Sequence, residues 1–133
     1  MAQKVTPFLM FEGKAEEAIN FYISVFENSR VVSIRRYGPG EAGAEGSVMQ
    51  ATISLAGQLL MFIDSPGHHD FTFTPSISFF VDCSEEQEVD NLFNKLSQDG
   101  QVFMPLNNYG FSRKFGWVGD RFGVSWQINL PGA

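Results

Sequence analysis

The same order of predicted elements occurs twice along the chain, and this repetition constrains the fold more than any other feature. The first half contains a strand, a helix and three further strands, predicted at residues 5–11, 13–26, 29–37, 47–56 and 58–64. The second half repeats this order, with elements predicted at residues 76–82, 84–100, 101–106, 114–118 and 124–130. Apolar residues alternate in the strands and recur at helical spacing in the helices, which is the basis for these assignments.

A duplicated module accounts for the repetition. When the two helices are aligned at a separation of 71 residues, Glu17 falls on Glu88 and Asn20 falls on Asn91. We therefore expect a single α+β domain over residues 1–133, with one βαβββ module at about 1–66 and a second at about 70–131. Four strands in each module would form a curved mixed sheet with its helix outside, and the two sheets would surround an open cavity.

Local signals mark some of the turns and helix ends. Ala56-Gly57 between two strands predicts a tight hairpin. Ser84 is a candidate N-cap for the second helix, with Gln87 completing a capping box and Gly100 ending the helix.

Composition and charge exclude several classes of protein. Fourteen Phe residues predict large apolar faces, and the net charge of −6 argues against a nucleic-acid partner. The one basic cluster, Arg30 with Arg35 and Arg36, is too small to change this view. No apolar run approaches 18 residues and the N-terminus lacks a signal-peptide pattern, so we expect a cytoplasmic protein with no membrane contact. A single cysteine, Cys83, excludes an intrachain disulfide.

Several stretches of the chain resemble the PhnB-like branch of the vicinal-oxygen-chelate (glyoxalase/bleomycin-resistance/dioxygenase) superfamily. These stretches are Thr6–Phe11 (TPFLMF), Ala15–Ala18 (AEEA) followed by Phe21 and Tyr22, Gly46–Met49 (GSVM), Ser76–Cys83 (SISFFVDC) and Gly116–Gln127 (GWVGDRFGVSWQ). The resemblance covers nearly the whole chain and implies the paired βαβββ fold and a homodimer. Members of this branch are often labelled as related to a demethylubiquinone methyltransferase. The sequence contains no Gly-rich strand-turn-helix of the kind that binds S-adenosylmethionine, so no cofactor is expected.

The resemblance also implies where a superfamily metal would bind. The equivalent positions are Thr6 (or Val5 or Pro7, if the register slips by one), Met61, Ser76 and Gln127. Only Gln127 is a reasonable ligand, because a divalent metal site normally has three or four His or carboxylate ligands. We therefore predict that the chain holds no metal at the inherited position.

His68, His69 and Asp70 form a second, local candidate for a metal site. Adjacent histidines on a strand would point to opposite faces, and in a loop they would need further ligands from elsewhere. A polar surface turn is the simpler interpretation, and a lid over the cavity or an adventitious metal site are the alternatives.

Strand alternation predicts which side chains line the cavity. The ligand-binding candidates are Phe8, Met10, Gln50, Thr52, Met61, Ser76, Ser78, Phe80, Trp117, Ser125 and Gln127. This lining is apolar with hydroxyls and amides, and it lacks the titratable group that acid–base catalysis needs. The alternative is that the large apolar members fill the cavity and leave no site.

Other residues have both a structural and a functional interpretation. Trp126 is predicted to pack under a helix, whereas Trp117 could stack on a ligand. Asp120 is expected to cap the hairpin loop, and Cys83 is expected to be a buried apolar side chain rather than an activated thiol. The segment Asn107–Lys114 could close over a ligand, with Arg113 or Lys114 supplying positive charge.

Three functions are compatible with the sequence. The leading hypothesis is a small-molecule-binding protein without the inherited metal, whose ligand is mostly apolar or aromatic. The second is an enzyme of the superfamily with a non-standard site, for example at His68, His69 and Asp70. The third is a dimeric interaction module. Metal content and ligand-induced thermal stabilisation distinguish the three.

Overall fold

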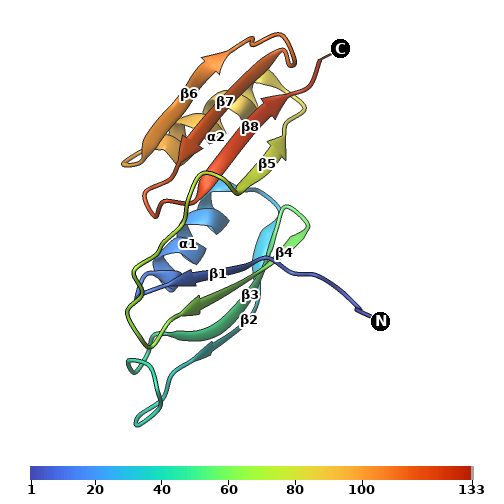
Figure 1. The fold of residues 1–133 in the computed structure, drawn as a ribbon. Helices are drawn as coiled ribbons and strands as arrows, with labels where there is room; N and C mark the ends of the chain where they lie inside the picture. The colour runs from blue at the N-terminus through green and yellow to red at the C-terminus, as the bar shows by residue number, and fades with distance from the viewer. Residues whose placement is uncertain (133) are drawn as a thin grey trace. The chain divides into compact units, whose positions relative to one another are not determined.

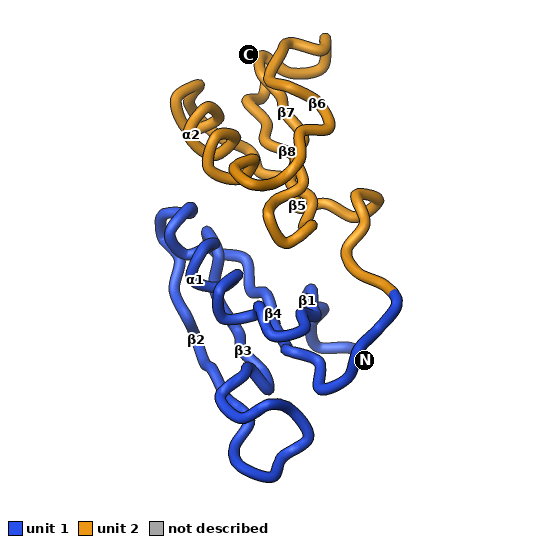
Figure 2. Tube along the Cα trace, turned by 90° about the vertical axis from the view of Figure 1, so that its left-hand side faces the viewer, with its two compact units in different colours: residues 1–70 blue, residues 71–133 orange. Residues whose placement is uncertain are grey.

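The repeated order of elements is present in the computed structural model, which describes residues 1–132 (Figure 1). The elements are β1 (Phe8–Phe11), α1 (Ala15–Val25), β2 (Ser29–Arg36), β3 (Val48–Leu55), β4 (Gln58–Asp64), β5 (Ser78–Asp82), α2 (Glu86–Ser97), β6 (Gln101–Asn107), β7 (Lys114–Gly119) and β8 (Ser125–Leu130). The chain divides into two compact units, residues 1–70 and 71–133 (Figure 2). No helix within residues 1–132 combines the length and apolar character needed to cross a bilayer.

The first unit is a mixed four-stranded sheet with one helix on one face (Figure 1). Its strand order is β1-β4-β3-β2, in which β1 runs parallel to β4 and the other neighbours are antiparallel. The ring of Tyr22 on α1 lies 6.1 Å from the ring of Phe62 on β4, and both side chains are fully buried. The core of this unit therefore lies between α1 and one face of its sheet.

The second unit has the same arrangement, with strand order β5-β8-β7-β6 and β5 parallel to β8. Gly116 on β7 faces α2, because a Cβ at this position would lie 2.6 Å from the ring of Phe93. Trp126 on β8 is almost fully buried, as predicted, and its ring packs 5.0 Å from that of Phe79. The core of this unit therefore lies on the α2 side of its sheet.

Tight turns follow from local chemistry. Ala56 and Gly57 both have positive φ, 49° and 91°, which is the conformation of the predicted two-residue hairpin between β3 and β4. Asp120 caps the turn before β8, as expected, since its Oδ1 accepts hydrogen bonds from the backbone N–H of Phe122 at 2.8 Å and of Val124 at 3.0 Å. Its Oδ2 accepts from Nε1 of Trp126 at 2.9 Å, which ties the turn to the core.

In each unit the first strand begins after a proline, later in the chain than predicted. β1 begins at Phe8 instead of residue 5, because Pro7 has no N–H to donate to the ladder, although its carbonyl accepts from the N–H of Met61. β5 begins at Ser78 instead of residue 76, because Pro75 and Ser76 form a turn.

The capping box of α2 is displaced by one residue from the predicted position. Glu85 is the N-cap and Glu88 is its partner, so the assignment of Ser84 with Gln87 is wrong. Ser84 instead donates to Oε1 of Glu88 from both its N–H and its hydroxyl, at 2.9 and 2.8 Å. These hydrogen bonds lower the pKa of Glu88.

The start of α1 depends on a side chain from a distant strand. The N-cap, Lys14, makes no side-chain capping bond. Oδ1 of Asp64, at the end of β4, instead accepts from the N–H groups of Gly13 and Ala15 at 2.8 and 2.9 Å. Its Oδ2 accepts from the N–H of Val48 at 3.0 Å. One buried carboxylate therefore joins the helix start to two strands.

Cys83 follows β5 and is buried. Desolvation, with smaller contributions from Glu88 and Asp82, raises the pKa of its thiol to about 11. The location before a helix therefore does not activate this thiol, because the nearest charges are carboxylates.

We expect Asp64→Ala to destabilise the chain by roughly 2–5 kcal/mol, because three backbone N–H groups lose a charged acceptor. Asp70→Ala is the matched control, since Asp70 is exposed, and it should change stability by less than about 0.5 kcal/mol. Urea unfolding followed by far-UV circular dichroism measures the free energy of unfolding of both variants. Tryptophan fluorescence is less suitable, because Trp117 and Trp126 report only on residues 71–132. Equal stabilities of the two variants would contradict the role of Asp64.

The native thiol of Cys83 should react with a disulfide reagent at pH 8 at least about 100-fold more slowly than an unperturbed cysteine, because little thiolate forms. The rate should still rise with pH above 9, and unfolding in denaturant should restore normal reactivity. A native rate equal to the rate in denaturant would show that the thiol is accessible and ionised.

Candidate functional site

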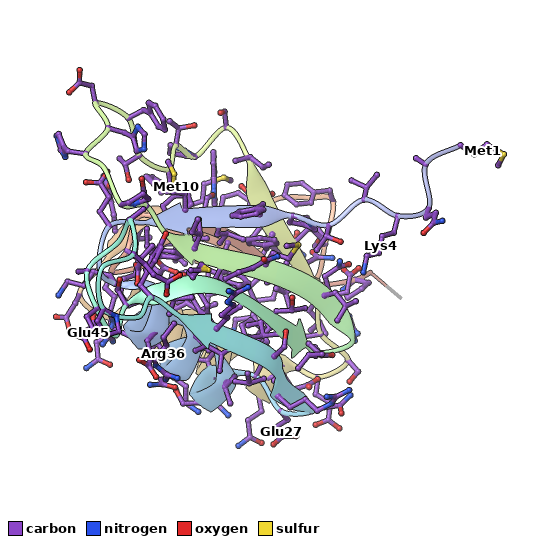
Figure 3. All side chains as sticks on the ribbon, turned by 90° about the horizontal axis from the view of Figure 1, so that it is seen from below. Met1, Lys4, Met10, Glu27, Arg36 and Glu45 are labelled. Atoms are coloured by element: carbon purple, nitrogen blue, oxygen red, sulfur yellow. The ribbon has the colours of Figure 1, made fainter. Side chains whose placement is uncertain are left out.

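The face of the first sheet that α1 does not cover carries five of the sequence-predicted candidates. Phe62 faces α1, so its neighbour Met61 faces away, and the register places Phe8 and Thr52 on either side of Met61. Strand alternation adds Met10 and Gln50 to the same face. Figure 3 shows this unit with all side chains drawn and Met10 labelled on β1.

The face of the second sheet opposite α2 carries five more candidates. The register forms one row of Phe80, Gln127 and Trp117 across β5, β8 and β7. Ser78 and Ser125 form the neighbouring row. The remaining candidate, Ser76, is not on the strand, because it lies exposed in the turn before β5 with its hydroxyl 2.8 Å from that of Thr74.

Trp117 is held in place on this face by a chain of hydrogen bonds. Its Nε1 donates to Oγ of Ser125 at 2.8 Å, and that hydroxyl lies 2.7 Å from Oγ of Ser78. Ser125 is buried, so the chain anchors the indole at its polar edge. The ring of Phe103 lies 5.2 Å from the indole ring, and together they form an ordered aromatic surface.

A second aromatic cluster lies at the other end of the same face. Phe115 is at its centre, with the rings of Phe111 at 5.0 Å, Tyr109 at 6.1 Å and Phe80 at 6.3 Å. Phe115 is buried, whereas Phe80 and Phe111 are 55% and 61% exposed. Tyr109 and Phe111 belong to the segment between β6 and β7, which the sequence suggested could close over a ligand.

Three polar side chains fix the base of this cluster. The hydroxyl of Ser112 donates to Oδ1 of Asn129, and Nδ2 of Asn129 donates to Oδ1 of Asp82 at 2.8 Å. Asp82 and Asn129 are paired in register on the open face. The sequence analysis did not include Asp82 in the lining, although it lies two residues after Phe80 on one strand.

The predicted role of Arg113 and Lys114 above a ligand is not supported. Nζ of Lys114 lies 2.6 Å from Asp90 and 3.0 Å from Glu86, both on α2, and these hydrogen bonds raise its pKa. Nε of Arg113 donates to the carbonyl of Pro131 at 2.8 Å. Lys114 is therefore engaged by α2, and Arg113 by the backbone that follows β8.

The residues at the superfamily metal positions do not fit a divalent ion. Thr6 and Ser76 offer hydroxyls, Met61 offers a thioether and Gln127 offers one amide oxygen. Three or four imidazole or carboxylate ligands are the usual requirement. We therefore derive no chemistry through a metal at these positions.

His68 and His69 have separate partners. Nδ1 of His68 lies 2.9 Å from Oε1 of Glu12, and Nε2 of His69 lies 2.9 Å from Oγ of Ser65. The hydrogen bond from His68 is the main cause of a lowered pKa for Glu12. Residues 1–132 contain no group of three or more His, Cys, Asp or Glu side chains placed to hold a metal ion.

The helix starts do not fit a nucleotide-like cofactor such as S-adenosylmethionine either. At the start of α1 the N–H groups of Gly13 and Ala15 are already bonded to Asp64, and at the start of α2 the Glu85–Glu88 capping box places two carboxylates. Each sheet also contains one parallel pair instead of the all-parallel arrangement of a nucleotide-binding fold.

Comparison with known proteins places this geometry in a family. The model of the family described as 3-demethylubiquinone-9 3-methyltransferase matches residues 3–129. A solved structure from Bacillus cereus, described as a putative 3-demethylubiquinone-9 3-methyltransferase, PhnB protein, is 57% identical, with a TM-score of 0.93 over 96% of this chain and 99% of that one. Protein YjdN of Escherichia coli (strain K12) is 24% identical over 95% of this chain and 94% of its own length.

A more distant likeness concerns the fold alone. The fosfomycin resistance protein FosX of Listeria monocytogenes is 9% identical, with a TM-score of 0.65 over 99% of this chain and 95% of that one. The paired βαβββ order, the strand order in both sheets and these matches agree. The chain belongs to the family described as 3-demethylubiquinone-9 3-methyltransferase, whose model matches nearly its whole length.

Proposed function

We propose that the protein binds a small aromatic molecule on the face of β5–β8 that α2 leaves uncovered. The observation that carries the proposal is the fixed indole of Trp117. Its polar edge is bonded to the buried Ser125 and its ring is flanked by Phe103, so the indole is already ordered before a ligand arrives. An ordered aromatic surface loses little conformational entropy on binding, which favours affinity.

Gln127 supplies a polar contact in the middle of this face. It lies in register between Phe80 and Trp117 and is partly exposed. Within residues 1–132 its side-chain amide has no hydrogen-bond partner, so both its donor and its acceptor are available. A few placed polar groups on an apolar surface are typical of small-molecule sites.

Binding fits this face better than acid–base or nucleophilic catalysis does. The hydroxyls of Ser78 and Ser125 are bonded to each other, Ser125 also accepts from the indole N–H of Trp117, and within residues 1–132 neither hydroxyl is hydrogen-bonded to a base. The carboxylate of Asp82, at the edge of the face, accepts a hydrogen bond from Asn129. Methyl transfer, the activity named in the family's description, is therefore not part of the proposed function.

Trp117→Ala should weaken the binding of a neutral aromatic probe, 2-naphthol, by about tenfold, because it removes the stacking surface. Trp117→Phe should retain most of the affinity. Val102→Ala is the matched control, because Val102 is exposed on the same sheet but is paired with Val118 on the α2 side. Isothermal titration calorimetry measures the Kd of 2-naphthol for wild type and for the three variants.

The proposal fails if wild-type protein does not bind 2-naphthol, or if Trp117→Ala binds it as tightly as wild type does. A loss of affinity in Val102→Ala equal to that in Trp117→Ala would also contradict it, since the effect would then not be specific to this face. Circular dichroism confirms that each variant is folded.

A further inference from the structure

The uncovered face of the first sheet changes from apolar to cationic across its four strands. β1 and β4 contribute Phe8, Met10, Leu59, Met61 and Ile63. The register then places Thr52 of β3 beside Met61 and Ser54 beside Leu59. The hydroxyls of β3 therefore separate an apolar half of the face from β2.

β2 adds two arginines to this face. Arg30 is paired with Ser54 and Arg35 is paired with Gln50, while Ser33 between them is paired with Thr52. The register shifts between Val31 and Ser33, so this bulge places residues 30, 33 and 35 on one side of the sheet.

Neither arginine is neutralised by the protein. Arg30 and Arg35 are exposed, and within residues 1–132 neither has a carboxylate or other hydrogen-bond partner. Arg36, the next residue, lies on the other side of the sheet and is labelled in Figure 3. It forms an ion pair with Glu16 of α1. In a chain with a net charge of −6, these two guanidinium groups without an ion-pair partner on one face are available to bind an anion.

Two acidic side chains at the ends of β4 and β1, Asp64 and Glu12, are engaged away from the arginines. Asp64 at the end of β4 is buried on the α1 side, where it holds the helix start. Glu12, which follows β1 at the opposite edge of the sheet, is occupied by His68 and by the N–H of His69. The β2 edge of the face therefore carries two guanidinium groups that form no ion pair within residues 1–132.

We propose that this face binds an amphipathic organic anion. Its apolar body lies on the β1–β4 half, and its carboxylate lies at β2, where Arg30 and Arg35 flank Ser33 and Thr52. Guanidinium groups suit a carboxylate because their N–H donors match its two oxygens. This assigns a ligand class to residues 1–70 and does not depend on the proposed site at Trp117.

Decanoate is the probe, compared with decan-1-ol and decyltrimethylammonium, which have the same apolar chain and a neutral or cationic head. We expect wild-type protein to bind decanoate most tightly by isothermal titration calorimetry. Arg30→Gln and Arg35→Gln should each raise the decanoate Kd about tenfold, while leaving the Kd of decan-1-ol unchanged. Arg36→Gln is the matched control on the same strand and should bind decanoate as wild type does.

Three results would overturn the proposal: no preference for decanoate over decan-1-ol, an unchanged decanoate Kd in both Arg30→Gln and Arg35→Gln, or an equal loss in Arg36→Gln. Sedimentation tests whether the arginines instead block pairing of the β2 edge, which charged residues on an edge strand can do. If Arg30→Gln and Arg35→Gln self-associate while their decanoate Kd is unchanged, the two arginines serve to prevent pairing of the β2 edge. Decanoate has no aromatic ring, so a failure of 2-naphthol to bind at Trp117 leaves the decanoate test unaffected.

Discussion

Each four-stranded sheet of this protein has a single helix, and one helix covers only one face. Burial of that face accounts for the core of each unit, through Tyr22 against Phe62 in the first and Gly116 against Phe93 in the second. The opposite faces carry large apolar and aromatic side chains, and on the first face these lie beside the hydroxyls of β3 and the arginines of β2. Exposed apolar area of this kind is typical of an interaction surface, and the proposed binding of ligands rests on these two faces.

Fixed polar contacts give these faces a defined geometry. The indole of Trp117 is anchored through Ser125, and the aromatic cluster around Phe115 rests on the bonds from Ser112 to Asn129 and from Asn129 to Asp82. Each of these polar groups has its partner within the unit, so the aromatic rings do not depend on a ligand for their arrangement. The first face also carries Arg30 and Arg35, which form no ion pair within residues 1–132. The ligands proposed for the two faces differ in chemistry for this reason.

Periodicity in the sequence predicted all ten elements and the doubled order, because each element has a clear apolar pattern. Alternation also predicted most of the residues that share the uncovered faces. It could not predict Asp64 as the cap of α1, since the bond to Ala15 spans 49 residues, or the ion pair between Lys114 and Glu86, which spans 28. Alternation also could not predict that Arg30 and Arg35 share a face. Without the bulge in β2, strict alternation would place them on opposite faces. The N-cap of α2 is Glu85, one residue later than predicted, with Glu88 as its capping-box partner.

The most direct test of binding on the helix-free faces is a nuclear magnetic resonance titration of the uniformly ¹⁵N-labelled protein with a neutral aromatic compound. The indole N–H of Trp117 and the side-chain amide of Gln127 are both observable, and both lie on the face opposite α2. The account predicts that these two signals shift with saturation while the amide signals of α2 from Glu86 to Ser97 move little. Saturable shifts confined to α2, or none on β5–β8, would contradict it.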